Sequence, residues 1–380
     1  MNSIWENETF YAPQDVLIAG SGFVGLWSAF YLKKKHPRLK ITIIDSGLIP
    51  TGASTRNAGF ACFGSLSEVV YDAQAMGTDK MLQLVEMRYK GLEKIRKHFK
   101  KDIDFDLCGG YELYEASGKI NSEQLQQNIE YINSIFKPVT GTKKTYRLED
   151  DKIDSFGFGK TKHLVKNNLE GYLHSGKLVQ SLLSTVQGMG VQVFNQTSLI
   201  EFIKNGNDFE LKLATANGSR FSMFANQLLI CTNAFTKKLL PDLDIVPARG
   251  QVLLTSPIEK LPWKGTFHSD EGFYYFRNLG NRVLLGGARN KAFQQEATVE
   301  METSDFIQKA LQQYLDDVAL PRFKGKYTIE MKWAGIMAMG SEKTPVIKEV
   351  QPGVFCAVRM SGMGVALAPV AAQEVIQMMR

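Results

Sequence analysis

The sequence predicts an α/β protein built around a parallel sheet. Residues 16–19 (VLIA) and 40–45 (KITIID) are short, apolar, partly β-branched runs typical of buried strands. Residues 23–32 (FVGLWSAFYL), which lie between them, have helical spacing, and the glycine-rich turn GSGFVG joins the first strand to this helix. The chain has 380 residues, 44% of them hydrophobic, which is enough for two or three domain-sized units.

The glycine-rich turn predicts a dinucleotide site. Gly20 permits a tight turn, Gly22 lets the backbone approach a pyrophosphate, and the helix N-terminus attracts the phosphates. Asp45, followed by Ser46, ends the second strand, where a carboxylate accepts hydrogen bonds from a ribose. The motif does not separate FAD from NAD. The candidate phosphate-binding residues are Gly20, Ser21, Gly22, Phe23, Val24 and Gly25.

A stretch of small residues, 51–65, follows the second strand and carries a single positive charge. Its hydroxyl and amide groups can donate hydrogen bonds, its arginine can neutralise a phosphate, and its glycines let backbone lie against a flat ring. A flexible surface loop is the alternative, but the apolar FACF at 60–63 favours a covered segment. The candidate cofactor-binding residues here are Ala53, Ser54, Thr55, Arg56, Asn57, Ala58 and Gly59.

The composition argues against several other classes. The net charge is +6, but the basic runs at 33–36 and 98–101 are short, which favours solvated helix ends over a nucleic-acid partner. The N-terminus lacks a basic leader, and the apolar stretch 16–32 is too short and glycine-rich to span a membrane. The cysteines are far apart, which argues against a metal site or disulfides and favours a cytoplasmic protein. They are Cys62, Cys108, Cys231 and Cys356.

The segment GASTRNAGF (52–60) resembles the GASxRNxG segment of a family of FAD-dependent oxidoreductases. That family includes D-amino-acid dehydrogenases, glycine and sarcosine oxidases and γ-glutamylputrescine oxidases. In these proteins the segment runs along the pyrophosphate and ribityl chain toward the flavin ring. The resemblance continues through most of the chain, over residues 170–202, 226–235, 246–257, 272–290, 332–347 and 354–379.

The resemblance implies FAD as the cofactor and adds residues that bind it. Leu199 would contact adenine, and Thr232, Asn233 and Ala234 would lie beside the adenosine half. The SGMG turn at 361–364 opens a helix whose N–H groups would stabilise the reduced flavin. Because 52–59 and 332–347 contain no Cys or His, the FAD is predicted to be non-covalent. The C-terminal candidates are Gly335, Ile336, Ser361, Gly362, Met363, Gly364 and Val365.

A C-terminal segment that returns to an N-terminal site implies a discontinuous cofactor domain. We expect a Rossmann-like FAD-binding domain over residues 10–85, 160–245 and 330–380. Residues 86–159 and 246–329 would form an α+β substrate (cap) domain that carries an antiparallel sheet.

The implied reaction is oxidation of the C–N bond of an amine or amino acid by hydride transfer to FAD. The product is an imine and then a carbonyl compound, and oxygen is the expected acceptor. Tyr275, Arg277 and Arg249 are the candidates for substrate binding, and either Tyr275 or its neighbour Tyr274 packs in the core because adjacent strand residues face opposite ways. Met337 occupies a position where amino-acid-oxidising relatives often have an arginine, so it is either part of a different substrate site or core.

Three other hypotheses remain open from the sequence. A D-amino-acid dehydrogenase would use the same cofactor but pass electrons to a quinone or another carrier. An FAD-containing binding or assembly protein would show no turnover. An NAD-dependent dehydrogenase would share only the first strand–helix–strand unit and would leave residues 51–65 and 354–379 unexplained.

Overall fold

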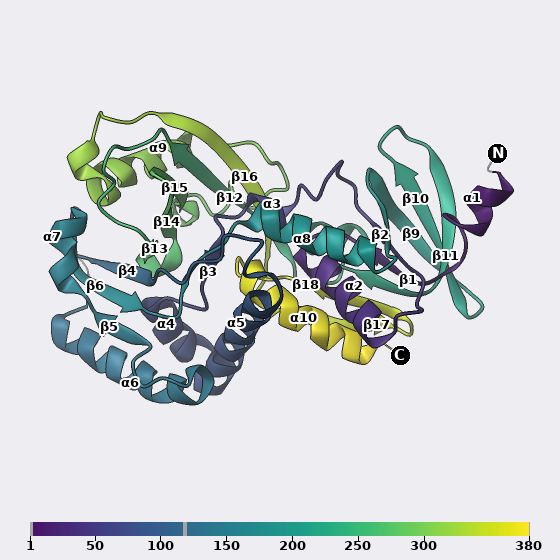
Figure 1. Cartoon of the computed structure of the whole chain (residues 1–380), viewed down its shortest axis with the longest axis horizontal. Coiled ribbons are helices and arrows are strands. Elements are labelled where there is room, and N and C mark those ends of the chain that lie inside the picture. Colours follow the sequence, from purple (N-terminus) through teal and green to yellow (C-terminus); the bar gives the residue numbers. More distant parts are fainter. Residues whose placement is uncertain (1–2, 117–119, 380) are drawn as a thin grey trace. The chain divides into compact units, whose positions relative to one another are not determined.

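The computed structural model describes residues 3–116 and 120–379, and the chain divides into two compact units (Figure 1). Unit 1 comprises residues 1–56, 175–248 and 336–380, and unit 2 comprises residues 57–174 and 249–335. The predicted boundaries differ from these, because residues 57–85 and 160–174 were expected in the cofactor domain. The helices in 57–85 instead pack against the helix of residues 122–140 in unit 2.

Unit 1 is built on a sheet whose strand order is β17-β18-β11-β1-β2-β8. All neighbours from β18 to β8 are parallel, and β17 pairs antiparallel at one edge. The central strands are buried on both faces, which explains their continuous apolar runs. The strands are β1 (Gln14–Ala19), β2 (Ile41–Ile44), β8 (Gln192–Phe194), β11 (Arg220–Ile230), β17 (Val346–Gln351) and β18 (Val354–Val358).

Helices and a strand meander complete unit 1. α2 packs against β1, β2, α8 and α10, and α10 also packs against β17 and β18 (Figure 1). The N-terminal half of β11 continues into the antiparallel meander β9-β10-β11. These elements are α1 (Ile4–Glu8), α2 (Phe23–Lys35), α3 (Ala53–Arg56), α8 (Ser175–Gly188), α10 (Gly364–Met378), β9 (Thr197–Asn205) and β10 (Asp208–Thr215).

Unit 2 contains most of a second sheet, with the order β16-β12-β15-β14-β13-β4-β6-β5. β12 pairs antiparallel with β15, and so do β15 with β14, β14 with β13, β4 with β6 and β6 with β5, whereas β13 and β4 are parallel. A short pair, β3 and β7, lies outside this sheet. The strands are β3 (Phe60–Ala61), β4 (Gly110–Glu115), β5 (Tyr146–Leu148), β6 (Thr161–Asn167), β7 (Gly171–Tyr172), β12 (Val246–Thr255), β13 (Thr266–Ser269), β14 (Tyr274–Leu279), β15 (Arg282–Gly287) and β16 (Ile329–Met339).

One face of the unit 2 sheet carries an aromatic core. Phe267 and Phe276 stack with ring centroids 4.8 Å apart, and Trp263 meets both rings edge-on. The helix α9 and the π-helical turn after it contribute Leu311 and Leu315 to this core. The unit 2 helices are α4 (Leu66–Met76), α5 (Thr78–Phe99), α6 (Ser122–Thr140), α7 (Ile153–Phe156) and α9 (Asp305–Tyr314), followed by the π-helical turn Leu315–Ala319.

Candidate cofactor and substrate sites

The carboxyl edge of the unit 1 sheet collects most of the residues predicted to bind the cofactor. β1, β2, β11 and β18 are parallel, so the residues that follow them emerge at one edge. These are Gly20 after β1, Asp45 after β2, Asn233 shortly after β11 and Ser361 shortly after β18. Ligands of open α/β sheets bind at this edge.

The turn between β1 and α2 has the geometry that its glycines predict. Gly20 has φ +108°, and a Cβ there would lie 2.7 Å from the carbonyl oxygen of Cys231. Gly22 is the N-cap of α2, and the first helical turn, which includes Val24, carries no acidic residue. The N–H of Phe23 donates to Ser54 Oγ (2.9 Å). The N-terminus of α2 therefore keeps its partial positive charge for an anion.

Asp45 is half-buried and organises this edge. Its Oδ2 accepts hydrogen bonds from the backbone N–H (2.8 Å) and the hydroxyl (2.7 Å) of Ser21, and its Oδ1 accepts from the N–H of Gly47 (2.9 Å). A carboxylate offers about four acceptor positions, so one remains for a ribose hydroxyl. Ser46 beside it is exposed. The backbone oxygen of Asp45 accepts from Thr197 N (2.8 Å), which fixes the start of β9, where Leu199 lies.

The loop of small residues crosses the boundary between the units. Its first part forms the four-residue helix α3, in which Thr55 Oγ1 donates to the carbonyl of Pro50 (2.6 Å) and Arg56 Nε donates to that of Thr51 (2.9 Å). Asn57, Ala58 and Gly59 belong to unit 2. The Oδ1 of Asn57 accepts from the N–H of Gly59 (2.8 Å), and Gly59 has φ +72°.

Two buried polar atoms at the unit 1 edge have no partner among the described residues: Asn233 Oδ1 and Ser361 Oγ. Both residues have positive φ, 47° and 46°. Thr232 bonds Thr236 (2.9 Å) and Ala234 is buried. Buried polar atoms are normally paired, so this edge fits a ligand that supplies the missing hydrogen bonds.

The start of α10 has the same character as the start of α2. Its N-cap, Met363, makes no side-chain cap, and its first turn begins at Gly364 and Val365. The first N–H groups of a helix have no partner within the helix. Gly362 has φ +83°, and a Cβ there would lie 3.5 Å from Met337 Sδ. Met337 is half-buried next to this turn, and its predecessors on β16, Gly335 and Ile336, are buried.

The substrate candidate Tyr275 lies on the face of β14 opposite the aromatic core. Tyr274 and Phe276 belong to that core, so Tyr275 and Arg277 project from the other face. The ring of Tyr275 meets Phe60 edge-on (5.8 Å). Burial raises the pKa of Tyr275 to about 12, although the charge of Arg289 opposes this. The hydroxyl therefore remains protonated at neutral pH.

Arg277 forms hydrogen bonds with two segments of unit 2 that are far apart in the sequence. Its Nη1 donates to the carbonyl oxygens of Gly59 (3.0 Å) and Leu173 (3.1 Å), and its guanidinium lies 4.4 Å from the ring centre of Tyr172. These contacts tie the end of the loop of small residues to β7. Burial lowers the pKa of Arg277 to about 10. A substrate role for Arg277 stays a prediction, while its present hydrogen bonds position the loop.

Arg249 forms a buried ion pair on the α9 side of unit 2. Its Nε and Nη2 each donate to Glu296 at 2.8 Å, and Gln251 donates to the same carboxylate. Gln251 also joins Ser304 at the start of α9 (2.9 Å). The charge of Arg249 is thus already neutralised. Its predicted substrate role is untested, but this pairing argues for a structural one.

Sequence reasoning missed Glu170, which positions residues near the end of the loop of small residues. Its Oε1 accepts from the N–H groups of Phe63 (2.8 Å) and Gly64 (3.1 Å), while Tyr146 donates to the carbonyl of Gly64 (2.6 Å). Burial raises the pKa of Glu170 to about 8. No motif marks this carboxylate, and its only signal is an acid that precedes the apolar strand β7.

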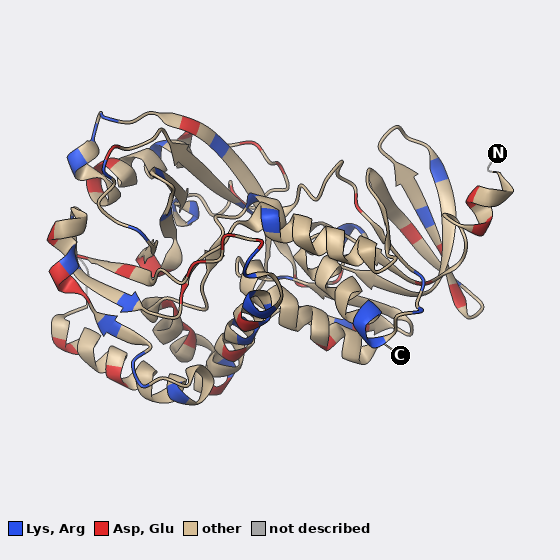
Figure 2. Ribbon diagram, in the orientation of Figure 1, with Lys and Arg blue, Asp and Glu red and all other residues tan. Residues whose placement is uncertain are grey.

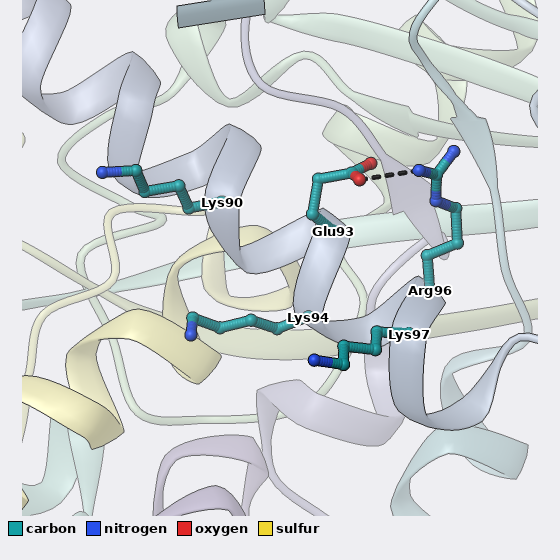
Figure 3. Close-up of a pocket in the computed structure, with 5 residues that line it drawn as sticks. All are labelled: Lys90, Glu93, Lys94, Arg96 and Lys97. Carbon is teal, nitrogen blue, oxygen red and sulfur yellow. Dashed lines mark hydrogen bonds and ion pairs between the residues drawn. The ribbon is translucent and has the colours of Figure 1, made fainter.

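A surface hollow lies elsewhere, on α5, and Figure 3 shows the residues that line it. Its lining is charged, and Arg96 pairs with Glu93 (2.7 Å). Figure 2 shows basic and acidic residues interspersed along this helix. None of the predicted site residues lines this hollow, which consists of Lys90, Glu93, Lys94, Arg96 and Lys97.

Unit 1 therefore has the sheet edge of a dinucleotide-binding protein. The model of the family described as FAD dependent oxidoreductase matches residues 15–378, and the chain belongs to this family. This family match confirms the predicted cofactor, FAD. It excludes the hypothesis that the protein is an NAD-dependent dehydrogenase. FAD fits the unpaired atoms of Asn233 and Ser361, the two helix starts whose N-cap residues make no side-chain hydrogen bond, and the remaining acceptor of Asp45.

The chain is similar to other proteins along most of its length. A probable oxidoreductase, OrdL, of Haemophilus influenzae is 22% identical over 96% of this chain and 82% of its own. Glycine oxidase from Geobacillus kaustophilus has a TM-score of 0.77 at 16% identity, covering 96% of this chain and 94% of its own. L-proline dehydrogenase from P. horikoshii has a TM-score of 0.76 at 16% identity, covering 96% and 93%. These likenesses confirm the predicted fold class.

No helix within residues 3–116 and 120–379 is both long enough and apolar enough to cross a membrane. In the same part of the chain, no group of three or more His, Cys, Asp or Glu residues is arranged to hold a metal ion.

Proposed function

We propose that the protein oxidises the C–N bond of a small amine or amino acid, with non-covalent FAD as its cofactor and oxygen as the terminal acceptor. The observation that carries this proposal is the similarity of nearly the whole chain to enzymes that act on amino compounds. These include a glycine oxidase, an L-proline dehydrogenase and an iminodiacetate oxidase from Chelativorans sp.. The similarity covers unit 2 as well as unit 1.

The reaction balances without a further cofactor. When bound, FAD accepts the hydride from the carbon next to the substrate nitrogen. The nitrogen loses a proton, water adds to the resulting imine, and a carbonyl compound and an amine or ammonia are released. Oxygen then takes up two electrons and two protons and leaves as hydrogen peroxide. The free N–H groups at the start of α10 favour negative charge beside them, which supports electron storage in this site.

The ionisable side chains of unit 2 support oxidation of a neutral amine. Tyr275 is protonated at neutral pH and can donate a hydrogen bond. Burial lowers the pKa of His268, opposite Tyr275 on β13, to about 4, so this imidazole is uncharged. Neither group is a base suited to pH 7. The rate should therefore rise with pH through the ionisation of the substrate amine itself.

Two finer features belong to this proposal. FAD would be bound by the residues predicted at the carboxyl edge of unit 1 and in residues 53–59, without a covalent link. We also propose a cytoplasmic location, which is supported by the free state of the cysteines Cys62, Cys108, Cys231 and Cys356.

The deciding experiment is anaerobic reduction of the FAD-loaded protein. Its visible flavin absorption should be bleached by at least one member of a panel of D-amino acids, N-methylated glycines and polyamine derivatives. If no amine bleaches the flavin, the protein is an FAD-containing binding or assembly protein. Protein that neither contains nor accepts FAD would contradict the proposal altogether.

The electron acceptor needs a second measurement. With the best substrate, hydrogen peroxide should form in the same amount as the carbonyl product when air is present. A dehydrogenase that passes electrons to a quinone would instead reduce an artificial quinone quickly and consume oxygen slowly.

A further inference from the structure

A row of ionisable side chains crosses the unit 2 sheet on the face away from the aromatic core. Glu112 of β4 is in register with His268 of β13, and His268 is in register with Tyr275 of β14. Register partners have neighbouring side chains on one face of a sheet. Phe60 meets the rings of His268 and Tyr275 edge-on, with centroids 5.0 and 5.8 Å away. The row therefore leads from the substrate candidate Tyr275 to a buried carboxyl group.

Glu170 places a second buried carboxyl group beside this row. Its side chain packs over Gly110 of β4, where an added Cβ would lie 2.8 Å from the Glu170 Cβ. Gly110 precedes Glu112 by two residues, so the two positions share one face of the strand. The Oε1 of Glu170 accepts two backbone N–H groups, and its Oε2 forms no hydrogen bond with a described residue. Two buried carboxyl groups are therefore gathered on the same face of β4.

A small hollow adjoins both carboxyl groups and has a volume of about 10 Å³, which is room for a single water molecule. Its polar lining includes Glu112, Glu170, Asn167 and His268. The buried atoms Asn167 Nδ2 and His268 Nε2 have no partner among the described residues. The orientation of the Asn167 amide is fixed, because its Oδ1 accepts from the N–H of Leu169 (3.0 Å). A buried water needs two to four polar partners, and this lining supplies them.

The two carboxyl groups are held in different ways. Glu112 accepts hydrogen bonds from the N–H and hydroxyl of Ser67 and from the hydroxyl of Tyr114. Glu170 accepts only at Oε1, so a proton on this group is carried by Oε2. Burial raises the pKa of both groups, that of Glu170 to about 8. Because two neighbouring carboxyl groups resist ionising together, the pair retains a proton at neutral pH.

The other ionisable groups around the pair stay in one charge state near neutral pH. Glu68 of α4 forms an ion pair with the buried Arg88 of α5 (3.1 Å). Burial lowers the pKa of His268 to about 4, although the charge of Glu68 opposes this. Burial also raises the pKa of the remaining groups, Cys62, Tyr114 and Tyr146, well above their usual values. The carboxyl pair is therefore the part of this cluster that can exchange a proton.

We propose that Glu112 and Glu170, linked to His268 by one water molecule in this hollow, hold the proton that the substrate nitrogen releases and return it when oxygen is reduced. This inference rests on the proposed function. The hydride supplies one hydrogen and both electrons of hydrogen peroxide, and the stored proton supplies the second hydrogen, so the cycle balances. His268 takes up a proton at one ring nitrogen as it releases one from the other, so it relays the proton without serving as the base.

The test follows the reaction of oxygen with FAD-loaded protein that has been reduced with dithionite, so that no amine is needed. Stopped-flow absorbance measures how fast the oxidised flavin returns. The rate of the parent should be constant up to about pH 8 and fall above it, because Glu170 then loses its proton. Glu170→Gln should react at least about tenfold more slowly at neutral pH and should lack this pH step. Glu330→Gln, which changes an exposed carboxylate, is the control and should follow the parent.

Two further measurements separate a relay from a structural role. His268→Ala should also react slowly with oxygen, and added imidazole should restore part of the rate, because a free imidazole can carry the proton in its place. Infrared spectra of the FAD-loaded parent at neutral pH should contain the absorption of a protonated carboxyl group that Glu170→Gln lacks. The inference is overturned if that absorption is missing from the parent, or if either variant reacts with oxygen as fast as the parent does.

Chemical reduction also separates this inference from the proposed function. If no amine bleaches the flavin but the oxygen reaction still depends on Glu170 and His268, the proton relay stands and the proposed amine oxidation fails. If amines bleach the flavin and the parent and Glu170→Gln proteins react equally fast with oxygen, the proposed function stands and the relay is wrong.

Discussion

The cofactor edge of unit 1 and the Arg249–Glu296 pair of unit 2 treat buried polar groups in opposite ways. At the edge, Asn233 Oδ1 and Ser361 Oγ are buried without a partner among the described residues. In unit 2, the guanidinium of Arg249 and the carboxylate of Glu296 satisfy each other in a buried ion pair. A buried polar atom without a partner costs about 1–3 kcal/mol. Ligand-binding groups are therefore better recognised by what is left unpaired than by residue type alone.

The largest expected effect tests the structural side of this contrast. Arg249→Met leaves Glu296 buried without its cation, so the free energy of unfolding of the apoprotein should fall by about 3–5 kcal/mol. Urea denaturation measures this. Arg282→Met breaks the more exposed pair with Glu330 and should cost only about 0–1 kcal/mol.

The double variant Arg249→Met/Glu296→Met should recover most of the lost stability, because no isolated charge remains. Equal stabilities of the Arg249→Met and Arg282→Met proteins would show that the buried pair is not structural. Arg249 would then return as a substrate-binding candidate.

The second effect concerns the pH dependence of unit 2. The pKa of Glu170 is raised from 4.5 to about 8 in the fold, so the folded state retains a proton that the unfolded state loses. Stability should therefore fall as the pH rises from about 4.5 to 8, by at most about 1.4 kcal/mol per pH unit, which is the effect of one proton.

Glu170→Gln keeps an oxygen for the N–H groups of Phe63 and Gly64 but cannot ionise. Thermal unfolding across this pH range should show a shallower decline for this variant than for the parent. Glu330→Gln, an exposed carboxylate, is the control and should follow the parent. Parallel curves for the parent and Glu170→Gln would mean that Glu170 is ionised throughout.

The third effect tests the ligand side of the contrast. Arg56→Ala should weaken FAD binding about tenfold or more, because a charge-assisted hydrogen bond to a phosphate contributes roughly 1.5–3 kcal/mol. The stability of the apoprotein should change less. Fluorescence titration of the apoprotein with FAD measures the affinity, and Arg38→Ala, which removes an exposed arginine of unit 1, is the control. If Arg56→Ala binds FAD as tightly as the parent does, the loop of small residues serves packing and not FAD binding.

The smallest effect is the sharpest test of an unpaired atom. Ser361→Ala should weaken FAD binding by about 1 kcal/mol, roughly fivefold. The stability of the apoprotein should not fall, because the hydroxyl has no partner to lose. Ser28 in α2 also has a buried hydroxyl without a partner among the described residues, but it lies inside the helix. Ser28→Ala should leave FAD affinity unchanged. If Ser28→Ala loses as much FAD affinity as Ser361→Ala, an unpaired hydroxyl at the carboxyl edge of the sheet does not mark the FAD site.

The sequence predicted the cofactor edge well because its signals are local. The strand, the glycine turn, the helix and Asp45 lie within about thirty residues, and each has a steric or electrostatic reason that short stretches reveal. The boundaries of the two units depend instead on packing between segments that are far apart in the sequence. The helices α4 and α5 follow the cofactor loop in the chain, but their contacts with α6 place them in unit 2.

The side chains of unit 2 were harder to assign for the same reason. The sequence around Arg249 does not reveal that Glu296, 47 residues away, neutralises its charge. Arg277 likewise donates to the backbone carbonyls of Gly59, just before β3, and Leu173, just after β7.

The order in which the strands of unit 1 occur has a consequence for synthesis on the ribosome. β1 is made long before its neighbour β11, which follows at Arg220–Ile230, and β18, which pairs with β11, comes at Val354–Val358. Parallel pairings between such distant segments form slowly. Between the synthesis of β1 and that of β11 the nascent chain therefore carries an apolar strand with an open edge, which exposes it to aggregation and makes it a client for chaperones.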